Sequence, residues 1–289
     1  MLVGFAPGGT TDTVIRIVND EVQKQLSSPV MIINKPGAGG SVAAKQVAQT
    51  SPDGYTLLCV TVHHTLFPAI AEKAVYSIHD FEPIAKLAIS PMILLTNQNS
   101  PWKTLDEVID YARKNPGKLK VGVTGIGSSA NMICEIIKRK ANVETVHIPF
   151  NSESETLTSV LGSHVDISGN SLGISSAHIK EGRLRALACT SLNRSSLIPE
   201  VPTLVELGYP EASISTYVGM VAPKKVARVR MDKICAAYEQ AIKAPRVITS
   251  LEKVGFVPDY LPPHEFQKFL VTSFEGFTKV ANEAKIKIK

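Results

Sequence analysis

The chain has 289 residues, of which 44% are hydrophobic and 20% charged, and a formal net charge of +5. This length usually gives one large or two medium-sized domains, and the apolar content excludes a chain that stays disordered. The longest apolar run, 84–95, is interrupted by Lys86, Ser90 and Pro91, and the scattered Lys and Arg argue against a nucleic-acid partner.

Short β-rich runs alternate with helical stretches, which is typical of an α/β fold with mainly parallel sheets. The first predicted elements are a strand at 2–5, a helix with Val14, Val18, Val22 and Leu26 on one face, a strand at 30–33, a helix at 42–48 and a strand at 55–62.

The middle of the chain continues this alternation. Thr104 and Glu107 form a capping box that predicts the start of a helix at Leu105. The predicted elements after it are strands at 119–124, 143–148, 165–168 and 184–190, and helices at 131–140, 155–161 and 177–181.

After an extended segment at 215–222 the chain is predicted to be helical at 226–242, 246–254 and 263–284, with an interruption at 255–258. A strand, a glycine-rich loop and a helix occur near residue 5 and again near residue 124, which favours two α/β lobes. We expect lobe 1 to comprise 1–98 and 221–289 and lobe 2 to comprise 99–220. The chain would then cross between them near 93–100 and 215–223.

The loop Pro7-Gly-Gly-Thr-Thr-Asp12 lies between a predicted strand and a predicted helix. Glycines let backbone N–H groups approach a ligand, and a helix N-terminus adds partial positive charge, so this loop fits an anion site. The alternative is a tight turn with a capped helix. Asp12, in the first turn, is expected to complement the helix dipole.

Two further loops are tested against the dinucleotide pattern. The loop 36–41 fails it, because Val42 occupies the third glycine position. The loop 125–130, Gly125 to Ala130, fits the G-x-G-x-x-A variant, with Glu144 near the expected spacing but at the start of the next strand. A nucleotide-binding α/β enzyme that uses this loop therefore stays open as the alternative.

Catalytic and metal-binding patterns are weak in this sequence. His63 and His64 are adjacent on a segment predicted to be extended, so they would point to opposite sides and could not share a metal. The four cysteines are widely spaced and are expected to be free, buried thiols. Gly, Ser, Thr and Asn recur at strand ends instead, which favours anion binding by hydrogen bonds and predicts no metal and no cofactor.

Several segments carry a resemblance to one family. They are Phe5-Ala-Pro-Gly-Gly-Thr-Thr-Asp12, Asn34-Lys-Pro-Gly-Ala-Gly-Gly40, Ser51-Pro-Asp-Gly-Tyr-Thr-Leu-Leu58, Pro116-Gly-Lys-Leu119, Gly125–Ser128, His147-Ile-Pro-Phe150, Gly182-Arg-Leu-Arg-Ala-Leu-Ala188 and Val201-Pro-Thr203. With them the chain resembles the Bug family of extracytoplasmic solute-binding proteins, the TctC-type receptors of tripartite tricarboxylate transporters.

This resemblance implies a two-lobed periplasmic-binding-protein fold, type II-like, with a ligand cleft between the lobes and hinge closure around a small carboxylate. It implies a monomeric, non-enzymatic receptor that delivers its ligand to a membrane permease. The ligand-binding residues that it implies are Phe5, Ala6, Gly8, Gly9, Thr10, Gly40, Ser41, Thr61, His63, His64, Thr124, Ser128, Ser129, Asn131, Asn151, Asn170 and Tyr217.

The sequence also departs from the family pattern. A first strand normally begins upstream of Leu2 and follows a signal peptide, so we expect a periplasmic protein whose leader has been removed or truncated. Ser168–Ser171 and the pair His63-His64 are unusual at positions expected to face the distal end of the ligand. A ligand-sensing regulator of similar architecture would need an appended helix-turn-helix.

Overall fold

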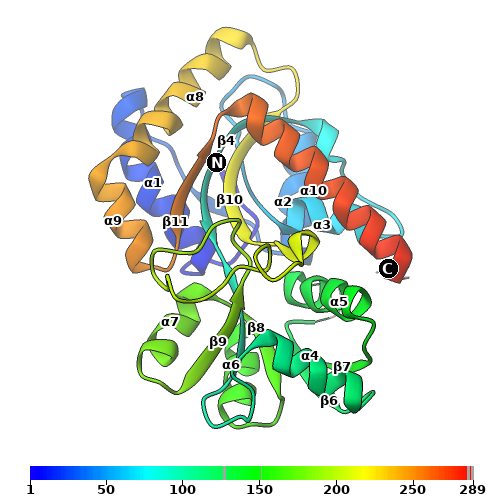
Figure 1. The fold of residues 1–289 in the computed structure, drawn as a ribbon. Coiled ribbons are helices and arrows are strands. Elements are labelled where there is room, and N and C mark those ends of the chain that lie inside the picture. The colour runs from blue at the N-terminus through cyan, green and yellow to red at the C-terminus, as the bar shows by residue number, and fades with distance from the viewer. Residues whose placement is uncertain (126–127, 151, 285–286, 288–289) are drawn as a thin grey trace. The chain divides into compact units, whose positions relative to one another are not determined.

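The computed structural model describes residues 1–125, 128–150, 152–284 and 287. The chain forms two compact units, of which the first comprises Met1–Ile89 and Tyr217–Lys289 and the second Ser90–Thr216. Each unit contains one β-sheet with helices packed against it (Figure 1). Within the described residues, the helices lack the combination of length and apolar composition that crossing a membrane requires.

The first crossing between the units lies at residues 89 and 90, earlier than the predicted end of lobe 1 at 98. Pro91 separates β4 (Phe81–Ser90) from β5 (Met92–Asn97), and β5 pairs with strands of the second unit. The second crossing falls at residues 216 and 217. The 84–95 run is therefore two strands, one in each sheet.

The sheet of the first unit has the strand order β11-β4-β10-β3-β1-β2. The strands not yet given are β1 (Leu2–Val3), β2 (Ile33–Asn34), β3 (Leu58–Thr61), β10 (Thr216–Pro223) and β11 (Val257–Leu261). β1 runs parallel to both β2 and β3, whereas β10 runs antiparallel to β3. The carboxyl ends of β1, β2 and β3 therefore lie at one edge of this sheet.

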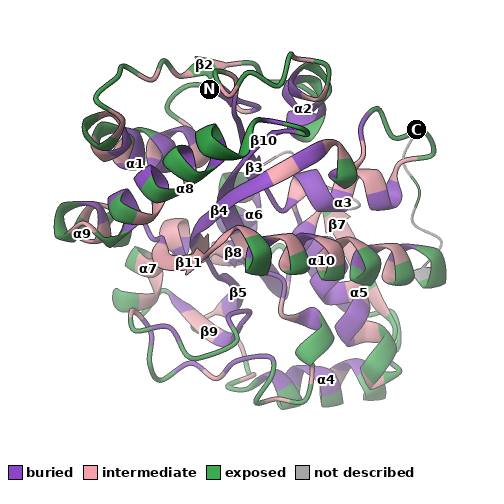
Figure 2. Cartoon of the chain, turned by 90° about the horizontal axis from the view of Figure 1, so that it is seen from above, coloured by how far each residue is buried: buried purple, intermediate pink, exposed green. Residues whose placement is uncertain are grey.

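Helices cover both faces of this sheet (Figure 1). The helices on one face are α1 (Thr10–Leu26), α8 (Arg228–Lys243) and α9 (Pro245–Lys253), and those on the other are α2 (Ser41–Ala48), α3 (His63–Ile70) and α10 (Pro263–Ala284). Val14, Val18 and Val22 are fully buried, as the spacing predicted for this helix, and Leu26 is half-buried. Burial of one face and exposure of the other is visible along these helices in Figure 2.

The sheet of the second unit has the strand order β7-β6-β8-β5-β9. Its further strands are β6 (Leu119–Val123), β7 (Thr145–Pro149), β8 (Ile167–Ser171) and β9 (Leu184–Cys189), and its helices are α4 (Leu105–Lys114), α5 (Ser129–Ala141), α6 (Glu153–Leu161) and α7 (Leu172–Lys180). β6 is parallel to β7 and β8, while β5 is antiparallel to β8 and β9. Ile93 and Leu95 face the α6 and α7 side, and Leu94 faces the α4 and α5 side.

The prediction for the two adjacent histidines was wrong. The segment that contains His63 and His64 is not extended, because β3 ends at Thr61 and the two histidines begin α3. Val62 accepts hydrogen bonds from the amides of Thr65 and Leu66, which starts the helical turn there. The predicted interruption of the helices at 255–258 is confirmed, because α9 ends at Lys253 and β11, which begins at Val257, pairs with β4.

The four cysteines are free, as expected. Cys59 in β3 and Cys134 in α5 are buried, as is Cys189, while Cys235 is half-buried. Burial raises the pKa of Cys134 to about 12 and also raises the pKa of Cys59. These thiols therefore stay protonated in the folded protein.

Candidate functional site

Three helices of the first unit begin at the same edge of its sheet. α1, α2 and α3 follow the carboxyl ends of β1, β2 and β3, respectively. Their N-cap residues are Gly9, Gly40 and Val62, and no side-chain cap is recorded at any of these three positions. Because the first N–H groups of a helix have no partner within it, this edge presents backbone donors with partial positive charge.

The loop before α2 has an unusual backbone. Gly37, Ala38, Gly39 and Gly40 have φ values of 146°, 45°, 63° and 93°, and glycine adopts such values at little cost. A Cβ at residue 40 would lie 2.9 Å from Cε1 and 3.0 Å from Nε2 of His64. A Cβ at Gly4 would lie 2.5 Å from the Cα of Gly40. The loops that follow β1 and β2 thus pack directly against each other and against α3.

The glycine amides in these loops close the turns themselves. Gly8 donates its N–H to Asp12, and Gly9 donates to the carbonyl of Ala6. Gly40 donates to Gly37, and Ser41 to Ala38. The tight-turn interpretation of the first loop therefore describes its backbone correctly. The donors left for an anion are those of the first helical turns rather than those of the glycines.

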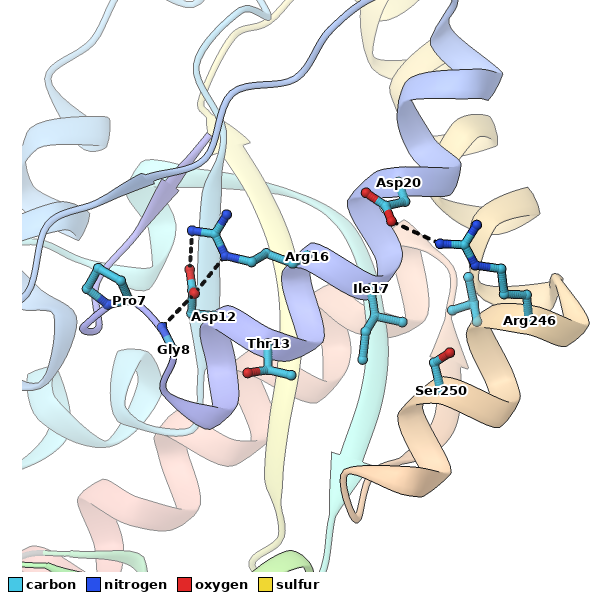
Figure 3. Close-up of a pocket in the computed structure, with 10 residues that line it drawn as sticks. Pro7, Gly8, Asp12, Thr13, Arg16, Ile17, Asp20, Arg246 and Ser250 are labelled. Carbon is cyan, nitrogen blue, oxygen red and sulfur yellow. Dashed lines mark hydrogen bonds and ion pairs between the residues drawn. The ribbon is translucent and has the colours of Figure 1, made fainter.

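Asp12 anchors the loop after β1. Its carboxylate accepts hydrogen bonds from the Gly8 amide at 2.8 Å, from Arg16 at 2.8 and 3.1 Å and from Asn34 at 2.8 Å. Figure 3 shows Gly8 and Arg16 converging on it. Burial raises the pKa of Asp12, but the hydrogen bonds from Arg16, Gly8 and Asn34 outweigh it and bring the pKa to about 2. Asn34 also donates to the carbonyl of Phe5, so β2 is tied to the same loop.

A surface pocket of about 420 Å³ lies between α1 and α9 (Figure 3). Its charged lining residues form two ion pairs, Arg16 with Asp12 and Arg246 with Asp20. Two carboxylates thus balance two guanidinium groups. This pocket offers no excess positive charge to an acidic ligand, in contrast to the helix N-termini at the sheet edge.

His64 lies at the centre of the packed loops. Its Nδ1 accepts a hydrogen bond of 3.0 Å from the Thr61 amide, and its carbonyl accepts one from the Tyr76 hydroxyl. The Phe5 ring packs edge-to-face against both His63 and His64, with centroid separations of 6.1 and 6.3 Å. Burial lowers the pKa of His64 to about 3 and also lowers the pKa of His63. Both rings are neutral at ordinary pH.

Tyr217 is the first residue of Tyr217–Lys289, the second of the two segments that make up the first unit, and it is 1% exposed. Its ring packs edge-to-face against Phe266 and Phe269 of α10, at centroid separations of 5.9 and 5.1 Å. Burial raises the pKa of its phenol. In this structure the side chain belongs to the packing of α10 on the sheet.

The predicted residues of the second unit are largely engaged in internal bonds. Ser128 caps α5 by accepting from the Asn131 amide, and the Asn131 side chain lies 2.8 Å from Nδ1 of His147. Asn170 is fully buried, donates to the carbonyl of Glu153 and accepts from Ser168.

Two further predicted positions of this unit lie between the end of β6 and the first turn of α5. Thr124 is half-buried after β6, and Ser129 is buried in the first turn of α5. Asn151 lies outside the described residues, as do positions 126 and 127 of the predicted nucleotide loop. Glu144 precedes β7 and approaches Lys138 at 3.7 Å, so it is at the wrong end of that strand for a ribose-binding acid.

The structure thus groups the predicted residues of the first unit at one sheet edge, except for Tyr217, whose ring packs on α10. Those that it brings together there are Phe5, Ala6, Gly8, Gly9, Thr10, Gly40, Ser41, Thr61, His63 and His64. The anchoring role of Asp12 was not predicted from the sequence. An acid three residues after the N-cap, following a glycine-rich loop, is a signal that could have indicated it, since side chains at this position reach back to the amides before the helix.

Comparisons with known proteins cover nearly the whole chain. A family model described as the tripartite tricarboxylate transporter family receptor matches residues 14–283. A "UPF0065 protein in gbd 5'region" of Cupriavidus necator is 34% identical over 269 residues, which are 93% of this chain and 82% of the relative. Protein BugT of Bordetella pertussis is 29% identical over 295 residues, covering 100% of this chain and 90% of BugT.

Solved structures with bound acids share the fold. MatC from Rhodopseudomonas palustris with bound malate has a TM-score of 0.78 and 29% identity, covering 96% of this chain and 97% of MatC. A second R. palustris protein, with adipate, has a TM-score of 0.82 and 25% identity, covering 99% of this chain and 97% of that protein. Malate and adipate are both small dicarboxylates.

Proposed function

This chain belongs to the tripartite tricarboxylate transporter receptor family, and on that premise we propose that it captures one particular small mono- or dicarboxylate in the periplasm. It hands this acid to a membrane permease and leaves it chemically unchanged. The sequence motifs predicted both the family and its carboxylate-binding role. The periplasmic location, the monomeric state and the permease partner belong to the proposal.

The observation that carries this proposal is the set of three helix N-termini at the carboxyl edge of β1, β2 and β3, without side-chain caps at Gly9, Gly40 and Val62. Backbone N–H groups and helix dipoles bind a carboxylate without a buried lysine or arginine. The donors are already oriented by the loops that Asp12 and Gly40 hold. Backbone N–H groups bind an anion by hydrogen bonds and do not themselves react with it.

The ligand class is supported by the relatives with bound malate and adipate. We assign the carboxylate to the first turns of α1 and α2 and to the residues of α3 that face them. The contributions predicted for the second unit, from Thr124, Ser128, Ser129, Asn131, Asn151 and Asn170, stay predictions. Because Asn131 and Asn170 already make internal hydrogen bonds, Thr124 and Ser129 are the stronger candidates among them.

The test is a binding panel on protein stripped of ligand by unfolding and refolding. Malate, succinate, adipate, citrate and benzoate are compared with succinamide and adipamide, which keep the size but lack the charge. A binding acid at ~100 times its Kd stabilises the protein by about 2.7 kcal/mol, which raises Tm, and calorimetry then gives Kd. The diamides should leave Tm unchanged.

Two outcomes would contradict the proposal. The first is an equal response to all acids and diamides, which would remove selective carboxylate capture. The second is chemical change of a bound acid, measured by mass spectrometry of the ligand recovered after prolonged incubation. Recovery of intact acid after selective binding supports a receptor rather than an enzyme.

A further inference from the structure

The two ring nitrogens of His64 have different surroundings. Nδ1 accepts a hydrogen bond from the Thr61 amide at 3.0 Å, within the turn that joins β3 to α3. A neutral imidazole that accepts at Nδ1 carries its proton on Nε2. The Thr61 amide therefore fixes one tautomer, in which Nε2–H is a hydrogen-bond donor.

This donor is buried and has no hydrogen-bond partner among the described residues. His64 is 3% exposed, and a Cβ added at Gly40 would lie 3.0 Å from its Nε2 and 2.9 Å from its Cε1. The hydroxyl of Thr61 is likewise buried and unpartnered in the described part of the chain. A buried donor left unpaired costs free energy, so proteins rarely keep one without a reason.

The position of this donor connects it with the proposed ligand. Gly40 is the N-cap of α2, and the ring of Phe5, which follows β1, packs against His64. His64 itself is in the first turn of α3. The unpaired Nε2–H thus lies between the starts of α2 and α3, next to Phe5 of the loop that leads from β1 to α1. The loop in front of it, Gly37–Gly40, has four consecutive residues with positive φ.

We propose that His64 donates a hydrogen bond from Nε2 to an oxygen of the bound carboxylate, and that it is a specificity-determining residue of this site. The inference rests on the proposed function. A fixed donor favours a ligand oxygen that only accepts, such as that of an ionised carboxylate, over an NH₂ group in the same place. Because Gly40 packs directly against His64, this proposal requires a local shift of Gly40 when the ligand oxygen binds.

The protonation state of the ring agrees with this role. Burial lowers the pKa of His64 to about 3, and the adjacent His63, also neutral, adds no positive charge at ordinary pH. His64 therefore contributes a directional donor and no charge. The helix N-termini attract the negative charge of the acid. His64 discriminates between an oxygen, which accepts its hydrogen bond, and an NH₂ group, which does not.

Two substitutions separate the ring nitrogens. In His64→Asn the side-chain oxygen can occupy the place of Nδ1 and accept from Thr61, but nothing reaches the place of Nε2. In His64→Gln the amide nitrogen reaches the place of Nε2 and donates, but the Nδ1 acceptor is lost. His79→Asn, an exposed histidine in the same unit, serves as the matched control.

The probe is whichever of malate and adipate binds the wild type more tightly, measured by calorimetry beside the ligand-free Tm. We expect His64→Asn to keep its ligand-free Tm close to wild type and to lose affinity tenfold or more. His64→Gln should lose ligand-free Tm but retain more affinity than His64→Asn. His79→Asn should match the wild type in both.

The opposite order overturns the inference. If His64 only supports the turn, His64→Asn binds like wild type and His64→Gln loses both Tm and affinity, while carboxylate capture itself still stands. If neither acid nor any other of the carboxylate panel binds the wild type, the proposed function fails and takes this inference with it. A ¹⁵N spectrum of the ligand-free protein that shows the proton on Nδ1 would also overturn it.

Discussion

The two units begin their helices differently where those helices follow parallel strands. In the second unit, α5 and α6 have side-chain caps, because Ser128 accepts from the Asn131 amide and Ser152 from the Glu155 amide. α7 has no such cap. In the first unit, α1, α2 and α3 all begin without one. The second unit thus caps two of these three helix starts with a side chain, whereas the first unit caps none of its three, as the proposed carboxylate site requires.

Among the substitutions that test this difference between the units, Gly40→Ala is expected to reduce stability and carboxylate affinity the most. An L-residue at positive φ costs about 1–2 kcal/mol, and the clash with His64 adds roughly 1–3 kcal/mol. Carboxylate binding should fall below detection. Gly117→Ala, at a φ of +68° with nothing within 4 Å of the added Cβ, controls for backbone strain alone. Urea unfolding and calorimetry measure both effects, and normal binding by Gly40→Ala would refute the role of this loop.

Asp12→Ala should follow in size. It removes the anchor of the Gly8 amide and leaves Arg16 and Asn34 without their shared acceptor, at a cost of about 2–3 kcal/mol. Affinity for the acid should drop about tenfold as the loop loses its shape. Asp20→Ala, on the same helix and paired with Arg246 at the surface, should change stability by about 0–1 kcal/mol. If the two substitutions lowered stability and affinity equally, the ion pair of Asp12 with Arg16 would contribute no more than the surface pair of Asp20 with Arg246.

Acid should weaken the first unit through His64. Its pKa is near 6.5 when unfolded and about 3 when folded. The unfolded state therefore binds more protons in this window. The stability contributed is complete above about pH 6.5 and is lost as the pH falls towards 3, by at most about 1.4 kcal/mol per pH unit.

Urea midpoints at pH 7, 6, 5 and 4, measured by circular dichroism on wild type and His64→Asn, test this slope. Trp102, the one tryptophan of the chain, lies in the second unit and reports on that unit by fluorescence. There His147, whose pKa burial also lowers, should give its own pH slope in both proteins. An identical slope by circular dichroism in the two proteins would contradict the assignment to His64.

The smallest expected effect comes from a cap of the second unit. Ser152→Ala removes the acceptor for the Glu155 amide and should cost about 1 kcal/mol, seen as a shift in the Trp102 transition. Thr104→Ala, which uncaps α4 in the same way, should cost a similar amount. Neither should change affinity for the acid more than twofold. A tenfold loss of affinity in Ser152→Ala alone would place that helix start in the binding site and end the contrast between the units.

The sequence predicted what depends on local pattern. The i, i+4 spacing of Val14, Val18 and Val22 predicted the buried face of α1, and the Thr104–Glu107 capping box predicted the start of α4, where the Thr104 hydroxyl accepts from the Glu107 amide. The glycine loops and the order of strands and helices predicted the α/β class. The family motifs predicted the family, and they pointed to loops that the structure brings together at the carboxyl ends of β1, β2 and β3.

What the sequence could not predict depends on residues far apart in the chain. The environment of His64 is set by Gly40 and Phe5, and its tautomer by an amide in a turn that was expected to be extended. Asn170, in β8, was expected to face a ligand, and its side chain donates a hydrogen bond to the carbonyl of Glu153, the first residue of α6. Neither contact leaves a periodic or composition signal, so only the folded arrangement shows it.

Each unit contains a buried thiol whose labelling rate reports how often that unit opens. Cys59 is in β3, beside the candidate site, and Cys134 is in α5. An alkylating reagent reaches either sulfur only when the surrounding unit opens, so pulse labelling and peptide mass analysis would time the opening of each half of the chain without any engineered tag. A bound acid held by the first unit should slow the labelling of Cys59.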